Sequence, residues 1–217
     1  TWIGADRGQT ALAAEAVGAR VLVMDDGHQN STLAKDLSII VVDSDYGFGN
    51  GRVFPAGPLR EPVEIGLKRA DAVIIMDGGD GIDVNPALTA WLRNFHQPII
   101  FAHFEPPTST ANFAGGKAVA FAGISRPQKF FATLEALGYE VIACHTFDDH
   151  HPFAPEEIMQ IVEQAAVAGA RPITTAKDAM RLPTEARAMV DVLEVNVGFT
   201  RPEAFDVLLK SIIKKPR

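Results

Sequence analysis

Short apolar runs alternate along the chain with segments of helical periodicity, and this alternation is the strongest constraint on the fold. The runs are continuous in apolar character, as expected of strands that are buried on both faces. The predicted strands span residues 20–24, 38–42, 72–76, 98–101, 117–122, 140–143, 172–175 and 192–195.

Helices are predicted between these strands. Residues 9–17 are rich in alanine, and three further helices each carry proline in or near the first turn, where the missing N–H leaves no bond unmade. Those three span residues 127–137, 155–168 and 202–213. Strands that alternate with helices predict an α/β fold with parallel sheets.

A change in composition divides the chain. Residues 104–117 are rich in Pro, Gly, Ser and Thr and lie between apolar runs. We therefore predict two α/β lobes, over residues 1–97 and 118–217, joined by linker strands within 98–117.

Charge and composition exclude several classes of protein. The net charge of −7 argues against broad nucleic-acid binding, which needs a dense basic face. No apolar run approaches the roughly 18 residues of a membrane span. The lone cysteine, Cys144, and the lack of a signal-peptide pattern favour the reducing cytoplasm.

An acidic doublet follows the first predicted strand. Ligands of parallel α/β sheets bind at the carboxyl ends of the strands, so Asp25 and Asp26 are placed to hold Mg²⁺ directly or through water. The simpler reading is that they cap the next turn. His28 and Gln29 add polar groups that a plain turn does not need.

A second acidic pair follows the next strand. Asp43 and Asp45 resemble the metal-binding Asp-x-Asp of nucleotide-sugar transferases, although the pattern also suits an ordinary turn.

A loop rich in glycine and proline spans residues 47–62. Glycine permits close backbone approach and proline stiffens the path, so the loop suits an anionic or sugar ligand with Arg52 or Arg60 as its phosphate partner. The alternative is a structured surface loop in which Glu61 caps a helix.

Two polar segments stand in the second half. The segment 147–153, Phe-Asp-Asp-His-His-Pro-Phe, can be read as an Asp–His pair that handles protons, as a metal site or as helix capping. In the segment 174–178, Thr-Thr-Ala-Lys-Asp, Lys177 can meet a phosphate or can be a solvated residue behind a helix-initiating threonine.

Together these segments resemble one family. The runs DDGHQN, VDSDYGFGNGRVFPAGPLREP, FAGISRPQKFFATLEALG, FDDHHPF and TTAKDAMRL are similar, in order and spacing, to tetraacyldisaccharide 4'-kinase. The resemblance covers the chain from about residue 6 to residue 182.

The resemblance implies an ATP-dependent kinase of lipid A synthesis that phosphorylates the 4'-hydroxyl of a tetraacylated glucosamine disaccharide 1-phosphate. It implies a phosphate-loop kinase-like lobe with a parallel sheet, here incomplete at its N-terminus, and a smaller C-terminal α/β lobe joined by a two-stranded linker. It also implies a peripheral protein on the cytoplasmic face of the bacterial inner membrane, which touches that surface through an N-terminal region that precedes these motifs.

The resemblance also assigns residues. Asp25 and Asp26 match the acidic pair near Mg²⁺ and the phosphates. Glu61 matches a carboxylate of the metal region, and Arg60 matches its neighbour, which faces the substrate or the nucleotide. His150 matches a histidine of the second lobe that supports an aspartate acting on the sugar hydroxyl. Predicted catalytic residues are Asp26, His150 and Asp25, predicted ATP-binding residues Arg60, Gln29 and Lys177, and predicted metal ligands Asp25 and Glu61.

The phosphate-loop sequence Gly-x₄-Gly-Lys-Ser/Thr does not occur in the 217 residues. We therefore expect that this polypeptide alone does not phosphorylate the lipid. Alternative functions are a non-catalytic binding protein derived from the kinase, and a nucleotide-sugar transferase that uses Asp43 and Asp45. The kinase reading predicts that Asp25, Arg60 and His150 share one pocket.

Overall fold

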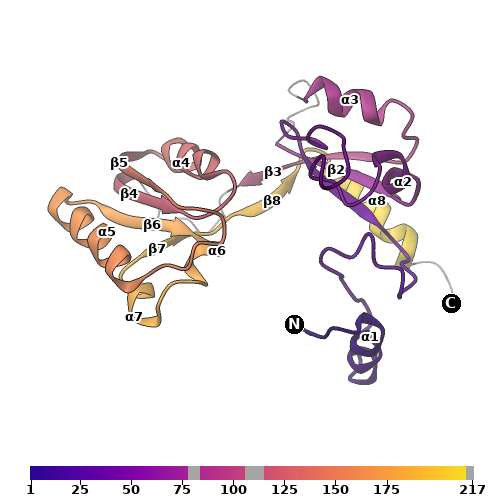
Figure 1. Ribbon diagram of the computed structural model, residues 1–217, viewed down its shortest axis with the longest axis horizontal. Helices are drawn as coiled ribbons and strands as arrows, with labels where there is room; N and C mark the ends of the chain where they lie inside the picture. Colours follow the sequence, from indigo (N-terminus) through magenta and orange to yellow (C-terminus); the bar gives the residue numbers. More distant parts are fainter. Residues whose placement is uncertain (78–83, 106–114, 214–217) are drawn as a thin grey trace. The chain divides into compact units, whose positions relative to one another are not determined.

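The computed structural model describes residues 1–77, 84–105 and 115–213, and the chain in it forms two compact units (Figure 1). Unit 1 comprises residues 1–104 and 197–217, and unit 2 comprises residues 105–196.

Unit 1 is built on a sheet with the strand order β1-β2-β3-β8. These strands are β1 (Ile39–Asp43), β2 (Ala72–Met76), β3 (Ile99–Glu105) and β8 (Asn196–Phe199). β2 pairs in parallel with β1 on one side and with β3 on the other. The neighbouring strands β3 and β8 are also the two places where the chain passes between the units.

Alternate residues of β2 face two separate cores, because successive side chains of a strand point to opposite faces. Val73 and Ile75 pack in a cluster with Leu88 and Leu92 of α3 (Pro86–Leu92). Ala72 and Ile74 pack in a second cluster with Leu208 of α8 (Pro202–Ile213). The sheet is therefore covered on both faces. Unit 1 also contains α1 (Arg7–Ala16) and α2 (Val63–Lys68).

Unit 2 has its own sheet with the strand order β5-β4-β6-β7, and the pairs β4–β5, β4–β6 and β6–β7 are parallel. The strands are β4 (Gly116–Ala122), β5 (Tyr139–Thr146), β6 (Arg171–Thr175) and β7 (Asp191–Leu193).

The helices of unit 2 also cover both faces of its sheet. Val119 and Phe121 of β4 pack in the cluster of α5, whereas the alternating alanines of the same strand pack in the cluster of α4. The helices are α4 (Pro127–Ala136), α5 (Pro155–Ala168), α6 (Ala176–Ala179) and α7 (Thr184–Arg187).

The predicted α/β class with parallel sheets is confirmed, and so are the four predicted helices and seven of the eight strands, within a few residues at their ends. The strand predicted over 20–24 is wrong. In the described part of the chain this segment has no ladder partner, and the side chains of Val21 and Val23 are 71% and 94% exposed. Apolar character alone does not make a strand when no neighbour accepts its hydrogen bonds.

The units also differ from the predicted ranges. Residues 197–217 were predicted in the C-terminal lobe, but they belong to unit 1 because β8 lies beside β3 and Leu208 is buried against the first sheet. Most of β3 likewise belongs to unit 1, although it was predicted as linker. Within the predicted linker, residues 106–114 lie outside the described residues.

Candidate functional site

The acidic doublet and the glycine-rich loop meet in unit 1. Nη1 of Arg60 donates hydrogen bonds to both carboxylate oxygens of Asp26, at 3.0 Å and 2.8 Å. Both side chains are more than 60% exposed, so the ion pair contributes little to stability. Asp26 has a φ of 51°, a left-handed backbone that is uncommon outside glycine. Asp25, beside it, is exposed.

The loop before Arg60 is held by its own contacts. Nδ2 of Asn50 donates to the carbonyl of Ala56 at 2.8 Å, and Val53 forms a β-bridge with Leu59. Gly57 is required by space, because a Cβ there would lie 2.4 Å from the carbonyl oxygen of Arg52. The loop is therefore a defined structure that presents Arg60 at its end.

Glu61 forms an ion pair rather than a helix cap. Nη2 of Arg69 donates to its Oε1 at 2.5 Å, and the side-chain amide of Gln29 donates to the same oxygen at 3.0 Å. The hydrogen bond from Arg69 lowers the pKa of the Glu61 carboxyl. The cap residue of α2 is Pro62, and no side chain caps that helix.

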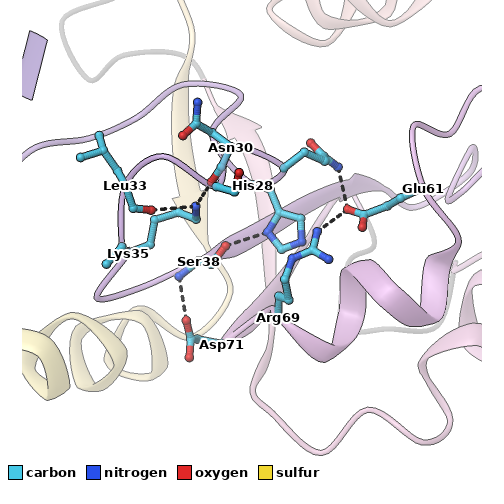
Figure 2. A pocket seen from close by; sticks show the side chains of 11 residues that line it. His28, Asn30, Leu33, Lys35, Ser38, Glu61, Arg69 and Asp71 are labelled. Atoms are coloured by element: carbon cyan, nitrogen blue, oxygen red, sulfur yellow. Dashed lines mark hydrogen bonds and ion pairs between the residues drawn. The ribbon is translucent and has the colours of Figure 1, made fainter. Parts of the chain in front are cut away.

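A cavity of about 490 Å³ lies beside this ion pair (Figure 2). It is lined by His28, Gln29, Asn30, Ser31, Leu33, Ala34, Lys35, Ser38, Glu61, Arg69 and Asp71. Two predicted residues, Gln29 and Glu61, are thus brought together on its wall. In Figure 2 the Glu61 carboxylate and the Arg69 guanidinium point toward each other, and the ring of His28 lies beside the guanidinium.

His28 fastens the segment that follows the doublet. Its Nε2 lies 3.0 Å from the carbonyl of Gly66 in α2 and donates to it, since a carbonyl only accepts. Its Nδ1 lies 2.7 Å from Oγ of Ser38, just before β1, and the backbone N–H of Ser38 donates to Asp71 at 2.8 Å. This brace fixes the turn that carries Gln29. Sequence reasoning missed Ser38, Arg69 and Asp71, because no motif marks them.

The second acidic pair closes a turn. Oδ1 of Asp43 accepts the backbone N–H groups of Asp45 at 2.9 Å and Tyr46 at 3.0 Å. This geometry agrees with the simpler reading of the Asp-x-Asp pattern, in which an aspartate caps its own turn.

In unit 2 a polar cluster lies at the carboxyl ends of β4, β5 and β6. Oγ of Ser125 donates to Asp149 at 2.8 Å, and Nζ of Lys177 donates to the other oxygen of Asp149 at 3.3 Å. The hydrogen bond from Ser125 and then Lys177 lower the pKa of the Asp149 carboxyl. Nε2 of His150 lies 3.9 Å from the same carboxylate.

A buried carboxylate lies beneath this cluster. The side chain of Asp178 is fully buried and accepts the backbone N–H of Gly123 at 3.1 Å, the hydroxyl of Thr175 at 2.7 Å and the guanidinium of Arg181. Arg181 also donates to the carbonyl of Gly123 at 2.8 Å. Sequence reasoning missed this pair, although both residues stand in the run TTAKDAMRL, which also contains Lys177.

The other histidine of the 147–153 segment contacts the glutamate that caps the start of α5 (Pro155–Ala168). Nε2 of His151 lies 2.9 Å from Oε2 of Glu157, which also accepts the backbone N–H of Ala154 before α5. No group of three or more His, Cys, Asp or Glu residues in residues 1–77, 84–105 and 115–213 is arranged to hold a metal ion. Within those same residues, no helix combines the length and the apolar character needed to cross a bilayer.

The structure therefore joins Asp26 to Arg60 and Glu61 to Gln29 in unit 1, and it places Lys177 and His150 on either side of Asp149 in unit 2. The pocket shared by Asp25, Arg60 and His150 stays a prediction, because it needs residues of both units.

Comparison with known proteins places these residues in a family. A family model described as tetraacyldisaccharide-1-P 4'-kinase matches residues 1–214. The tetraacyldisaccharide 4'-kinase of Rhodospirillum rubrum is 50% identical over 98% of this chain and 63% of its own length. That of Rhodospirillum centenum is 48% identical over 98% of this chain and 61% of its own length.

A solved structure is also similar. The crystal structure of LpxK from Aquifex aeolicus in complex with ATP superposes with a TM-score of 0.64 at 25% identity, over 94% of this chain and 61% of that one. The chain thus spans about three-fifths of the length of the relatives that it matches.

Proposed function

The chain belongs to the tetraacyldisaccharide-1-P 4'-kinase family, and we propose that the protein transfers the γ-phosphoryl group of ATP to the 4'-hydroxyl of a tetraacylated glucosamine disaccharide 1-phosphate. The contact between Asp26 and Arg60 carries the proposal, because it brings the acidic doublet and the end of the glycine-rich loop to one place in unit 1.

The proposed reaction forms a bond between the 4'-oxygen and the γ-phosphorus and breaks the bond between that phosphorus and the β–γ bridging oxygen. ADP leaves, and the hydroxyl proton passes to a base. Catalysis of such transfers is mostly positioning and charge stabilisation. Arg60 is suited to bind phosphate, since its guanidinium already holds an oxyanion, the carboxylate of Asp26. We assign His150 to support removal of the proton.

The described residues fit a nucleotide-bound Mg²⁺ better than a metal held by protein alone. Mg²⁺ in kinases is held by one or two carboxylates, substrate phosphates and water, so three clustered ligands are not required. Asp25 and Asp26 would supply such carboxylates. Glu61 would have to leave Arg69 first. When bound, Mg²⁺ neutralises the charge that develops on the phosphates.

Phosphate transfer from labelled ATP tests this function. The assay compares the product of the complete reading frame with the 217-residue chain, on the tetraacylated disaccharide 1-phosphate. Transfer by the complete product supports the proposal. We expect no transfer by the 217 residues, which contain no Gly-x₄-Gly-Lys-Ser/Thr sequence. If the complete product binds the lipid and ATP but transfers nothing, the protein is the binding protein derived from the kinase.

We also propose that the protein is peripheral on the cytoplasmic face of the inner membrane, because its proposed substrate carries acyl chains. Flotation of the complete product with vesicles that contain the disaccharide lipid tests the proposal. Co-flotation that high salt or carbonate reverses supports a peripheral attachment, and a protein that stays below the vesicles contradicts it.

A further inference from the structure

We propose that Asp149 is a positioning residue for His150, and that Ser125 and Lys177 hold its carboxylate in place. This inference rests on the proposed function for its catalytic meaning, but its geometry belongs to unit 2 alone. Each oxygen of Asp149 has a different donor: Lys177 on Oδ1 and Ser125 on Oδ2. The imidazole of His150 lies within ion-pair distance of Oδ2.

The backbone of His150 is also held in place by contacts with other residues. His150 has a φ of 64°, which costs a non-glycine residue free energy and persists only where neighbours enforce it. Its N–H donates to the carbonyl of Gly123 at 3.2 Å. Asp178 and Arg181 bind the N–H and the carbonyl of Gly123, so a buried ion pair anchors the point to which the turn attaches.

Gly123 is also in close contact with the turn that carries Asp149 and His150. A Cβ at this position would lie 3.1 Å from the carbonyl oxygen of Asp148 and 3.4 Å from Cβ of His151. The turn that carries Asp149 and His150 therefore packs directly on the end of β4. Backbone anchor and carboxylate partner together restrict the directions open to the imidazole, which is otherwise 71% exposed.

This geometry gives Lys177 a different role from the predicted one. A lysine that binds ATP phosphate contributes mainly to affinity for ATP, whereas a lysine that holds Asp149 acts only through that carboxylate. The two roles make opposite predictions for KM and kcat. Ser125 provides an independent check, because a neutral hydroxyl holds the other oxygen of Asp149.

Steady-state kinetics of the complete product test the inference on the proposed reaction. We expect Asp149→Asn to lower kcat about tenfold or more, with KM for ATP unchanged. Lys177→Met should lower kcat less and should have no further effect in the Asp149→Asn background, since coupled residues are not additive. Asp148→Asn and Lys117→Met are the matched controls, because both side chains are exposed. A raised KM for ATP in Lys177→Met, or independent multiplicative effects, overturns the inference.

Mobility of the His150 ring tests the inference without any transfer reaction. We expect ¹³C relaxation of the full chain to show a restrained ring in the wild type and in Asp148→Asn. In Asp149→Asn and Lys177→Met the ring order parameter should fall below about 0.6, the range of flexible groups. Equal ring mobility in all four proteins overturns the inference, even if the kinase is active. A complete product without kinase activity refutes the proposed function. The mobility of the His150 ring then still tests the inference that Asp149 positions His150.

Discussion

At the scale of single residues, the proposed role of Asp26 predicts that its substitution affects the reaction far more than it affects stability. The carboxylate of Asp26 and the carboxamide of an asparagine have nearly the same shape, and asparagine tolerates the left-handed backbone of this position. We therefore expect Asp26→Asn to change the free energy of unfolding by less than about 0.5 kcal/mol. Loss of the charge should lower kcat/KM by about 100-fold or more.

Urea denaturation and the labelled-ATP assay measure the two effects of Asp26→Asn side by side. Asp36→Asn is the control, because Asp36 is also exposed and also lies on unit 1 before β1. An Asp26→Asn protein with full turnover contradicts the assignment of the doublet to the reaction. A large loss of stability would mean that Asp26 has a structural role.

Asp178 is expected to behave in the opposite way. Its fully buried carboxylate is paired with Arg181, whose Nε and Nη1 are already buried without a hydrogen-bond partner in the structure. Removing one partner of a buried pair leaves an uncompensated charge, so Asp178→Asn should lower the free energy of unfolding of unit 2 by about 3 kcal/mol.

The urea midpoint of unit 2 measures this loss, with Glu163→Gln on the exposed side of α5 as the control. The double variant Asp178→Asn/Arg181→Met should regain part of the stability, since it no longer buries an unpaired guanidinium. A single variant as stable as the control contradicts the prediction.

The residues of the site were partly predictable for a physical reason. Polar side chains directly after apolar strands, such as Asp149 and Lys177, can be found because the carboxyl ends of parallel strands meet at one edge. The residues that hold these side chains in place cannot be found in this way. Ser38, Arg69 and Arg181 are ordinary residues whose importance comes from contacts that no local pattern in the sequence marks.

At the scale of elements, the start of α5 links stability to pH. Glu157 accepts the N–H of Ala154, and this bond, followed by the contact with His151, lowers the pKa of its carboxyl. A lowered pKa in the folded state means that the stabilisation is complete above the ordinary glutamate value of about 4.3 and is lost as the pH falls through the folded-state value.

Glu157→Gln should therefore have a lower urea midpoint than the wild type at pH 7, and the difference should disappear at acid pH, where the wild-type carboxyl is neutral too. Glu156→Gln, one residue earlier and exposed, controls for the loss of a negative charge near the helix start. A difference that grows on acidification is the contrary outcome.

The elements that sequence predicts best are those that carry their own signals. Proline in the first turn locates α4, α5 and α8, because it suits that position and few others in a helix. A strand carries no such signal of its own, since its hydrogen bonds go to another segment. The run at 20–24 looks like β2 in sequence, yet only β2 has neighbours on both sides in the described residues.

At the scale of the whole molecule, the predicted lobes were wrong because they were drawn as consecutive ranges of the chain. A division into consecutive ranges assumes that each lobe is continuous, and unit 2 is. Unit 1 is completed by β8 and α8 from the far end of the chain. The β3–β8 pairing is a contact between residues about a hundred positions apart, which local composition does not encode.

This arrangement predicts that the last residues stabilise the first unit and not the second. Deletion of 197–217 removes the neighbour of β3 and takes Leu208, Phe205 and Phe199 from the core that contains Ala72 and Ile100. Loss of Leu208 alone corresponds to about 2–5 kcal/mol. Unit 2 keeps both of its own cores.

Hydrogen exchange followed by mass spectrometry can read the two units separately. In the chain ending at Asn196, the amides of β1, β2 and β3 should exchange faster, and those of β4, β5 and β6 at the rate of the uncut chain. Leu208→Ala should reproduce the effect in part, whereas Val207→Ala, at a side chain that is 68% exposed, should not. If truncation speeds exchange equally in both sheets, the two units unfold together, and the C-terminal helix stabilises the molecule as one cooperative body.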